Sequence, residues 1–351
     1  MQNKLILKFR KRYFSSMEDS ILSLFVLFIY GLIFYGLFNW LILKGVWNGD
    51  ANSCRVSSGA CVSFLKEKFS FIIFGVYPRE HIFRPILGLL LLVCGWVHLT
   101  NKKNWNKFIF LKLFFIILVY VLLLVGVGKH EVPTSKLGGL PLTLLLSSIG
   151  VLVSYPLGIL LALGRTSNIV TFKWPCTVFI EIIRGVPLIS VLFMASVMIP
   201  LFLPQGLNFD KVLRAQLAII FFSSAYFAEV VRGGLNSIPK GQWEAGSSLG
   251  LSYYQIVVNI VLPQALVKVI PPTINTIIGM FKDTSLVIVI ALFDLMGTTK
   301  ASMTDSLWLG FSLEAYFLCA VIYYIICSRM GAFSRKVESE FMLKKQRSIN
   351  D

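Results

Sequence analysis

The chain has 351 residues, of which 56% are apolar, and it carries a formal net charge of +16. Only 14% of its residues are charged, against about 25% in an ordinary soluble domain, which is too few to cover a water-soluble protein of this size. The apolar runs are long and continuous, which excludes the short alternating strands of a membrane β-barrel. The composition predicts an all-α protein that crosses a membrane several times.

The positive charge does not indicate nucleic-acid binding. Lysine and arginine gather mostly in the two tails and in short loops, where membrane topology accounts for them. No soluble segment combines a basic patch with interleaved aromatic residues. We therefore expect no nucleic acid among the partners, and the spacing of Cys and His predicts no metal site.

Three apolar runs precede residue 139, at 21–43, 85–99 and 108–127, and each is expected to span the membrane. A polar loop near 45–82 separates the first two and ends in "FSFIIFGVYP", an aromatic patch too short to cross and suited to the membrane interface. The loop also holds Cys54 and Cys61, which could pair if it faces an oxidising compartment. Residues 1–138 are thus predicted to form a three-helix membrane extension with an extracytoplasmic loop.

The stretch "GKHEVPTSKLGG" clusters glycine, proline and charge and predicts a boundary. Five spans are expected after the boundary, at 140–163, 174–203, 215–231, 264–281 and 307–328. The run 285–293 is too short to cross and is expected to be re-entrant or interfacial. With the three earlier spans the total is about eight, which puts both termini on one side of the membrane.

The basic residues orient these spans. The N-terminal segment, the "NKKNWNK" loop and the C-terminal tail are rich in Lys and Arg, so both termini are expected in the cytoplasm. On this topology the loop 232–255 is also cytoplasmic. The bias is imperfect, because the first outer loop also carries Arg55, Lys66, Lys68 and Arg79.

The cytoplasmic stretch "RGGLNSIPKGQWEAGSSLGLSYYQ" spells a short helix, a corner and a second helix start. Pro239 suits a first helical turn, Gly250 suits a C-terminal stop, and Ser252 with Gln255 fits a capping box. The helix between them has about eleven residues, or about 16 Å, and cannot span a bilayer. Its small residues are expected to form a flat face for a partner: Ala245, Gly246, Ser247 and Ser248.

The spacing of this stretch follows the pattern E-A-A, three residues, G, nine residues, I, one residue, L-P. It resembles the EAA loop of the membrane subunits of ABC importers, a loop that docks into a groove on the ATP-binding subunit. One position departs from the pattern, since Gly246 stands where the family has Ala. The matching residues are Glu244, Ala245, Gly250, Ile260, Leu262 and Pro263.

Three further segments resemble the polar amino acid permeases: "IEIIRGVPLISVLF", "SAYFAEVVRGGLNSIPKGQWEAG" and "FKDTSLVIVIALFDLMG", the last resembling the general L-amino acid permease subgroup. The resemblance implies a five-helix type I ABC importer core over 139–331, followed by a cytoplasmic tail, 332–351, in a bacterial inner membrane. It also implies an ATPase dimer, a second homologous permease, a periplasmic amino-acid-binding protein and membrane lipid as partners. This chain has no G-x-x-x-x-G-K-[ST] loop, so ATP and Mg are expected on the ATPase and no cofactor on this chain.

Charges inside a span are costly and indicate function. Glu181 and Arg184 are three residues apart on one face of an expected helix and could pair. Beside the helix break at Gly185-Val186-Pro187 they would line a substrate pathway; the alternative is a pair that only fixes helix packing. The other candidate pathway residues are Ser223, Tyr226, Asp283, Thr284 and Ser285.

A competing function is that of an ion-coupled secondary amino acid carrier, which Glu181, Glu229 and Glu314 would serve. Such a carrier would not need a docking loop. A membrane-embedded enzyme has no support, because the sequence has no His-rich cluster, nucleophile elbow or metal-ligand spacing. No catalytic residue is therefore predicted.

Overall fold

The computed structural model describes residues 13–101, 104, 108–126, 128, 131–202, 204 and 209–350, with only the helical backbone for 341–350. The basic N-terminal segment, most of the "NKKNWNK" loop, and Val127 and Leu203 at the ends of two expected spans lie outside these residues. The described chain is almost entirely helical and divides into two compact units. Two of the three boundaries fall within helices α4 and α17, and the third follows the end of α16.

The first unit comprises residues 1–69 and 303–316. Helix α2 starts at a Ser16 cap, whose side chain accepts the Asp19 N–H, and none of its residues is buried. The core of this unit is small and aromatic, with Phe64 packed against Trp308 and Phe311. Its helices are α2 (Met17–Phe38), a π-helical turn (Asn39–Leu43), α3 (Ala51–Val56), the start of α4 (Val62–Phe74), a 3-10 turn (Ser306–Trp308) and the start of α17 (Ser312–Asn350).

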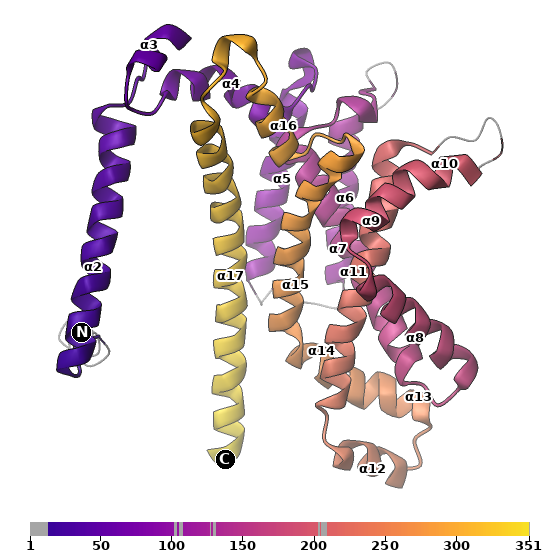
Figure 1. Cartoon of the computed structure of the whole chain (residues 1–351). Coiled ribbons are helices and arrows are strands. Elements are labelled where there is room, and N and C mark those ends of the chain that lie inside the picture. The colour runs from indigo at the N-terminus through magenta and orange to yellow at the C-terminus, as the bar shows by residue number, and fades with distance from the viewer. Residues whose placement is uncertain are drawn as a thin grey trace. The chain divides into compact units, whose positions relative to one another are not determined.

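The second unit comprises residues 70–302 and 317–351. Small residues let its helices approach closely: a Cβ at Gly158 of α7 would lie 2.6 Å from the Phe227 Cβ of α11. In Figure 1, α12 and α13 lie at one end of this unit and α16 at the other. Its helices, besides the rest of α4 and α17 and short 3-10 or π-helical turns, are α5 (Phe83–Thr100), α6 (Ile109–Val125), α7 (Gly139–Thr166), α8 (Val170–Gly185), α9 (Leu188–Phe193), α10 (Ile199–Phe202), α11 (Lys211–Asn236), α12 (Lys240–Ser248), α13 (Tyr253–Ile256), α14 (Leu262–Lys268), α15 (Ile270–Asp283), the 3-10 helix η8 (Thr284–Ile290) and α16 (Leu295–Ser302).

Within the described residues, six helices are long and apolar enough to cross a membrane, or seven if the bent pair of α8 with α9–α10 is one span. The pair bends by 103° at Val186 and Pro187, where the sequence predicted a break. Helix α6 is apolar but has only 17 residues. The predicted class, an all-α protein with about eight membrane helices, agrees with this architecture.

The region 264–293 differs from its prediction. Pro271 and Pro272 lie in the first turn of α15, where a missing N–H costs nothing, so the span begins at Ile270 and not at residue 264. The helix does not stop at Phe281 either. It continues as η8, because the Thr284 hydroxyl donates to the Phe281 carbonyl oxygen at 2.8 Å and a tighter turn follows. Residues Ile270–Ile290 form one candidate span, and a separate re-entrant run at 285–293 was the wrong interpretation.

Candidate functional site

The predicted cytoplasmic helix is present as α12, and it ends in a glycine corner. Beyond Ser248 the Leu249 N–H donates to the Ala245 carbonyl oxygen at 3.2 Å, and the Leu251 N–H donates to that of Gly246 at 3.2 Å. Gly250 has a φ of +73°, a left-handed conformation that glycine adopts without steric cost. The chain therefore reverses here within a few residues.

A capping box begins α13 directly after the corner, as predicted. The Gln255 N–H donates to the Ser252 hydroxyl at 3.4 Å, and the Ser252 N–H donates to the Gln255 side-chain oxygen at 2.9 Å. The Trp243 ring of α12 stacks on the Tyr253 ring of α13, with centroids 5.9 Å apart. We call residues 240–256 the α12–α13 hairpin.

Gly246 lies inside this hairpin, so the prediction that it belongs to the flat docking face is wrong. A Cβ at this position would lie 2.8 Å from the Ile256 Cγ1, too close for an unshifted side chain. Gly246 is buried, whereas Ala245, Ser247 and Ser248 are exposed. The departure from the E-A-A pattern therefore accompanies a large side chain on the facing helix.

The hairpin is fixed to the membrane helices by a second hydrophobic core. Ile256 and Val261 pack there with Val231 and Leu235 of α11. A Cβ at Gly234 would lie 2.4 Å from the Val269 Cγ1, so α11 also passes close to the end of α14. Two polar contacts add to this packing: Gln264 donates to the Gln242 side-chain oxygen at 3.0 Å, and Lys268 donates to the Ser237 carbonyl oxygen at 2.8 Å.

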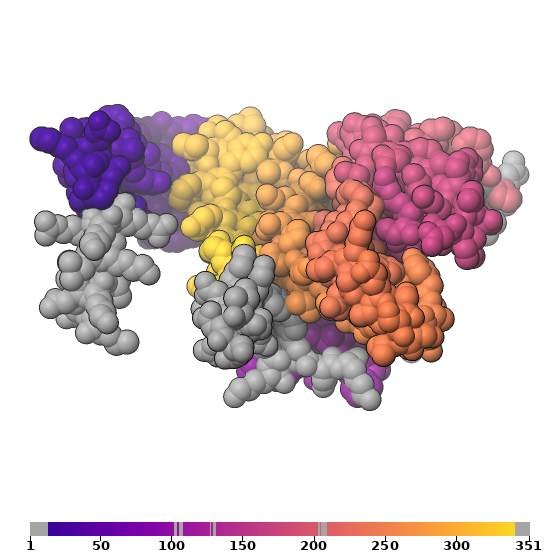
Figure 2. Space-filling model, turned by 90° about the horizontal axis from the view of Figure 1, so that it is seen from below, coloured from indigo at the N-terminus to yellow at the C-terminus, as the bar shows by residue number. Residues whose placement is uncertain are grey.

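The opposite face of the hairpin is uncovered. Glu244 and Ala245 are exposed, and Leu249 and Tyr254 are 77% and 72% exposed. Figure 2 shows this segment on the face seen from below. Of the other residues that matched the EAA pattern, Ile260 and Leu262 are half-buried and Pro263 is exposed. Exposed apolar side chains on a polar loop are typical of a protein contact surface.

A network of charged residues joins the ends of α7, α8 and α11. Glu229 lies at its centre: Arg165 and Arg184 approach one carboxylate oxygen at 3.4 and 3.3 Å, and Arg232 donates from its Nε at 3.1 Å. Arg165 also pairs with Glu181 at 2.6 Å. Three guanidinium groups thus face two carboxylates, which leaves one excess positive charge.

The pairing of Glu181 with Arg184 that their spacing allows is therefore not formed. Their spacing permits a contact along α8, but each side chain finds a closer opposite charge on a neighbouring helix, Arg165 of α7 and Glu229 of α11. Arg165 was not among the predicted site residues. A single Arg at the end of a span is usually explained by topology alone, and the sequence gives no sign that α7 ends beside α8.

The structure brings together only some of the predicted pathway residues. The Arg184 guanidinium lies 5.9 Å from the Tyr226 ring centroid, a cation–π distance. Ser223 is buried on α11. Among the described residues, no hydrogen bond or ion pair joins Asp283, Thr284 or Ser285 on α15 and η8 to the charged network. A substrate pathway through these side chains stays a prediction.

The polar loop of the first unit has its own cluster. Cys54 and Cys61 are bonded in the structure, with their Cα atoms 5.4 Å apart, a separation that suits a disulfide. The Cys61 N–H donates to the Glu314 carboxylate at 3.1 Å. This contact gives the buried Glu314 a hydrogen-bond donor. The sequence alone does not indicate a partner for this carboxylate in the last span.

Comparison with known proteins identifies the family. Residues 154–338 match the model of the binding-protein-dependent transport system inner membrane component. The inner membrane amino-acid ABC transporter permease protein YhdY of Escherichia coli is 41% identical over 95% of this chain and 92% of its own length. The glutamate/glutamine/aspartate/asparagine transport system permease protein BztC of Rhodobacter capsulatus is 33% identical over 94% of this chain and 92% of its own.

A solved structure agrees with the sequence relatives. A crystal structure of an amino acid ABC transporter with histidines matches 57% of this chain and 92% of its own chain, with a TM-score of 0.52 and 29% identity. The uncovered hairpin at one end of the helices and the matches over nearly the whole length lead to the same assignment. The chain belongs to the inner membrane components of binding-protein-dependent transport systems, and it is a permease subunit of an amino-acid ABC transporter.

Proposed function

We propose that this chain moves L-amino acids inward across the bacterial inner membrane, as one of two homologous permease subunits, with energy from ATP hydrolysed on a partner ATPase dimer. A periplasmic amino-acid-binding protein delivers the substrate. ATP and Mg bind the ATPase, since this chain lacks a phosphate-binding loop. Membrane lipid surrounds the spans, and both termini lie in the cytoplasm. The names of the relatives, which are amino-acid permeases, support the substrate class.

The observation that carries this proposal is the α12–α13 hairpin. Its outer face exposes Glu244, Ala245 and Tyr254, while its inner face is fixed to α11 and α14. A surface of this kind transmits a push from a docked subunit to the membrane helices, because the packed core between them does not deform continuously. Closure of the ATPase dimer thus tilts α11 and opens the pathway toward the binding protein.

The charged network adds a candidate contact for the substrate. Its excess guanidinium charge lies at the end of α8, beside the bend at Val186 and Pro187. A broken helix beside a network of net positive charge suits the carboxylate of an amino acid. An ion-coupled carrier, the competing function, would have no use for the docking face, and the relatives are ABC transporter permeases.

Replacing Glu244 by Lys tests the coupling. The exposed side chain is not needed for packing, so the variant is expected to insert normally and to lose most uptake while ATPase activity continues uncoupled. The measurement is amino-acid uptake and ATP hydrolysis by the whole transporter in proteoliposomes. The matched control is Glu338→Lys, the same charge reversal at an exposed position of α17, which should keep uptake. Normal uptake by Glu244→Lys would refute the proposed docking face.

A further inference from the structure

A hollow of about 340 Å³ opens where α4 turns toward α5, and residues 70–82 supply its lining. The turn is made at Gly75, which has a φ of +63°, and a Cβ there would lie 3.0 Å from the Gly138 Cα. Tyr77 fixes the other side of the turn, because its hydroxyl donates to the Leu124 carbonyl oxygen at 2.7 Å. Packing and hydrogen bonding therefore hold the wall of this hollow, which we call the Arg79 hollow.

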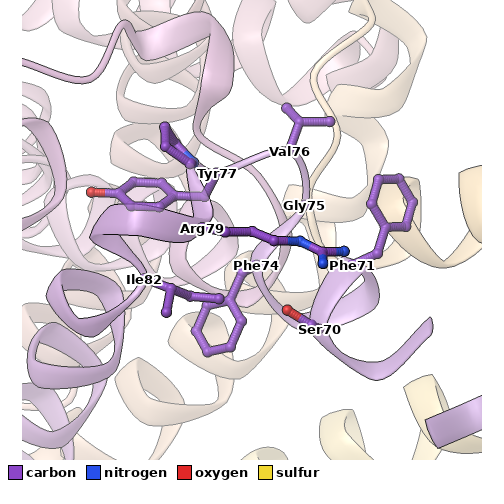
Figure 3. Close-up of a pocket in the computed structure, with 9 residues that line it drawn as sticks. Ser70, Phe71, Phe74, Gly75, Val76, Tyr77, Arg79 and Ile82 are labelled. Carbon is purple, nitrogen blue, oxygen red and sulfur yellow. The ribbon is translucent and has the colours of Figure 1, made fainter. Parts of the chain in front are cut away.

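The Arg79 side chain extends across the hollow toward Ser70 and Phe71, while the Tyr77 ring points away (Figure 3). Within the described part of the chain, neither the Arg79 guanidinium nor the Ser70 hydroxyl has a protein hydrogen-bond or ion-pair partner. Glu80 follows in the sequence but does not line the hollow. A guanidinium presents several donors in one plane and suits the oxygens of an anion.

The first outer loop contains three other basic residues that run against the positive-inside bias. Unlike Arg79, these residues have protein partners. Each of those has a protein partner within the first unit, so its charge is accounted for without a ligand. Arg55 donates to the Leu307 carbonyl oxygen at 3.1 Å, Lys66 donates to that of Trp47 at 2.8 Å, and Lys68 pairs with Asp305 at 2.5 Å.

The remaining side chains of the lining are mostly apolar. Phe71, Phe74 and Ile82 line the hollow, and the candidate span of α5 starts at Phe83, immediately after it. A second hollow of about 180 Å³ shares Phe71 and Val76 with the first and is lined mainly by apolar side chains. A cationic anchor beside an apolar wall, at the end of a span, matches an amphiphile with an anionic head.

We propose that the Arg79 hollow binds the phosphodiester headgroup of an anionic phospholipid from the outer leaflet of the inner membrane. Arg79 and Ser70 donate to the phosphate oxygens, and the first acyl carbons lie on Phe74 and Ile82. The volume, about 340 Å³, lies at the lower end of the range of small-ligand pockets, about 300–1,000 Å³, which suits a headgroup and not a whole lipid. With no acidic side chain in the lining, a head of net negative charge is favoured. This inference rests on the proposed topology.

The test uses the full chain reconstituted in nanodiscs of phosphatidylglycerol and phosphatidylcholine, then transferred to mild detergent for native mass spectrometry. The wild type is expected to retain phosphatidylglycerol, and Arg79→Gln to retain it about tenfold less, the size of effect that loss of a charge-assisted phosphate contact produces. Arg79→Lys should recover part of the retention. The control is Lys44→Gln, which removes an exposed positive charge at the end of the first span, outside the hollow.

A second measurement places the lipid directly. A photo-crosslinking benzoyl-phenylalanine at Phe74 should attach phosphatidylglycerol to the peptide containing residues 70–82, and Arg79→Gln should abolish the adduct. Equal retention by wild type and Arg79→Gln, or an adduct unchanged by the variant, would overturn the proposal. So would loss of the adduct in 100 mM inorganic phosphate at constant ionic strength, because that result assigns the hollow to a soluble anion. Both readouts are independent of uptake, so failure here leaves the proposed transport function intact.

Discussion

At the scale of single residues, Gly246 shows how one deviation from a family pattern is compensated. Glycine has a lower helix propensity than the alanine of the family pattern. In the structure the missing side chain lets α12 lie directly on Ile256 of α13. The hairpin is held by this contact and by the Trp243–Tyr253 stack, so close packing replaces the helix propensity that alanine would have supplied.

Restoring the alanine should therefore destabilise the protein. Gly246→Ala places a Cβ 2.8 Å from the Ile256 Cγ1, and such overpacking costs about 1–3 kcal/mol. Thermal unfolding in detergent measures the effect. Gly241→Ala is the matched control, because a Cβ there meets nothing within 4 Å. Gly246→Ala with Ile256→Ala should relieve the clash; equal melting temperatures for Gly246→Ala and Gly241→Ala would contradict this account.

Asp294 gives a second prediction at this scale, on the pH dependence of stability. It lies buried outside the candidate spans, and burial raises its pKa from 3.8 to about 6 although the Gly297 N–H donates to its carboxylate at 2.9 Å. A raised pKa means that the folded state holds the proton more tightly than the unfolded state does. The stability from this proton is complete below about pH 4 and is lost as pH rises through 6.

The lost stability is of the order of 3 kcal/mol, because each unit of pKa corresponds to about 1.4 kcal/mol. Asp294→Asn keeps an acceptor for the Gly297 N–H and removes the titration. The melting temperature of Asp294→Asn, relative to that of the wild type, should rise between pH 5 and pH 7. Asp305→Asn serves as the control: Lys68 lowers the pKa of Asp305, so its stabilising effect changes only below about pH 4. A constant difference between Asp294→Asn and wild type would argue against the raised pKa.

At the scale of elements, the charged network connects three helices that are distant in sequence. Glu229 is its hub, with a side chain only 26% exposed and three arginines around it, whereas Glu181 is 56% exposed and contacts Arg165 alone. Removing the Glu229 carboxylate leaves partly buried guanidinium groups without a counter-charge. The resulting loss of stability is large compared with the loss from breaking an exposed ion pair.

Glu229→Gln is therefore expected to destabilise the transporter by about 1–3 kcal/mol, and Glu181→Gln by less than about 1 kcal/mol. The shift in melting temperature of the two variants, measured in the same detergent at low and high salt, makes the comparison. Salt should weaken the Glu181 contact more, since it is closer to solvent. A larger shift for Glu181→Gln would show that the network has another centre.

The elements also show what the sequence can predict. Caps and corners depend on neighbours in the chain, so the Gly250 turn, the Ser252 capping box and the break before Pro187 were all predicted correctly. Contacts between helices depend on how the helices are packed, and for this reason the sequence missed Arg165 and paired Glu181 with the wrong arginine. The continuation of α15 into η8 escaped because a Lys–Asp pair in an apolar run resembles a helix end.

At the scale of the whole molecule, the proposed topology puts the hairpin and the polar loop on opposite sides of the membrane. Lys240 and Ser58 are both exposed. A cysteine introduced at Lys240 should react with an impermeant maleimide only from the cytoplasmic side, and a cysteine introduced at Ser58 only from the outer side. Labelling of intact cells and of inverted vesicles makes the test, after replacement by alanine of the four cysteines that are free in the structure. Labelling of both positions from the same side would refute the topology.

Among the candidate spans of the described residues, helix α2 differs from the others in that none of its residues is buried within its own unit. The surrounding medium requires only that its side chains be apolar, and it does not require a particular side chain at a particular position. The order of residues along α2 therefore carries little structural information. Over evolutionary time this helix is free to drift in sequence at constant hydrophobicity, whereas α7 and α11, in which Gly158 and Gly234 meet a neighbouring backbone, are not.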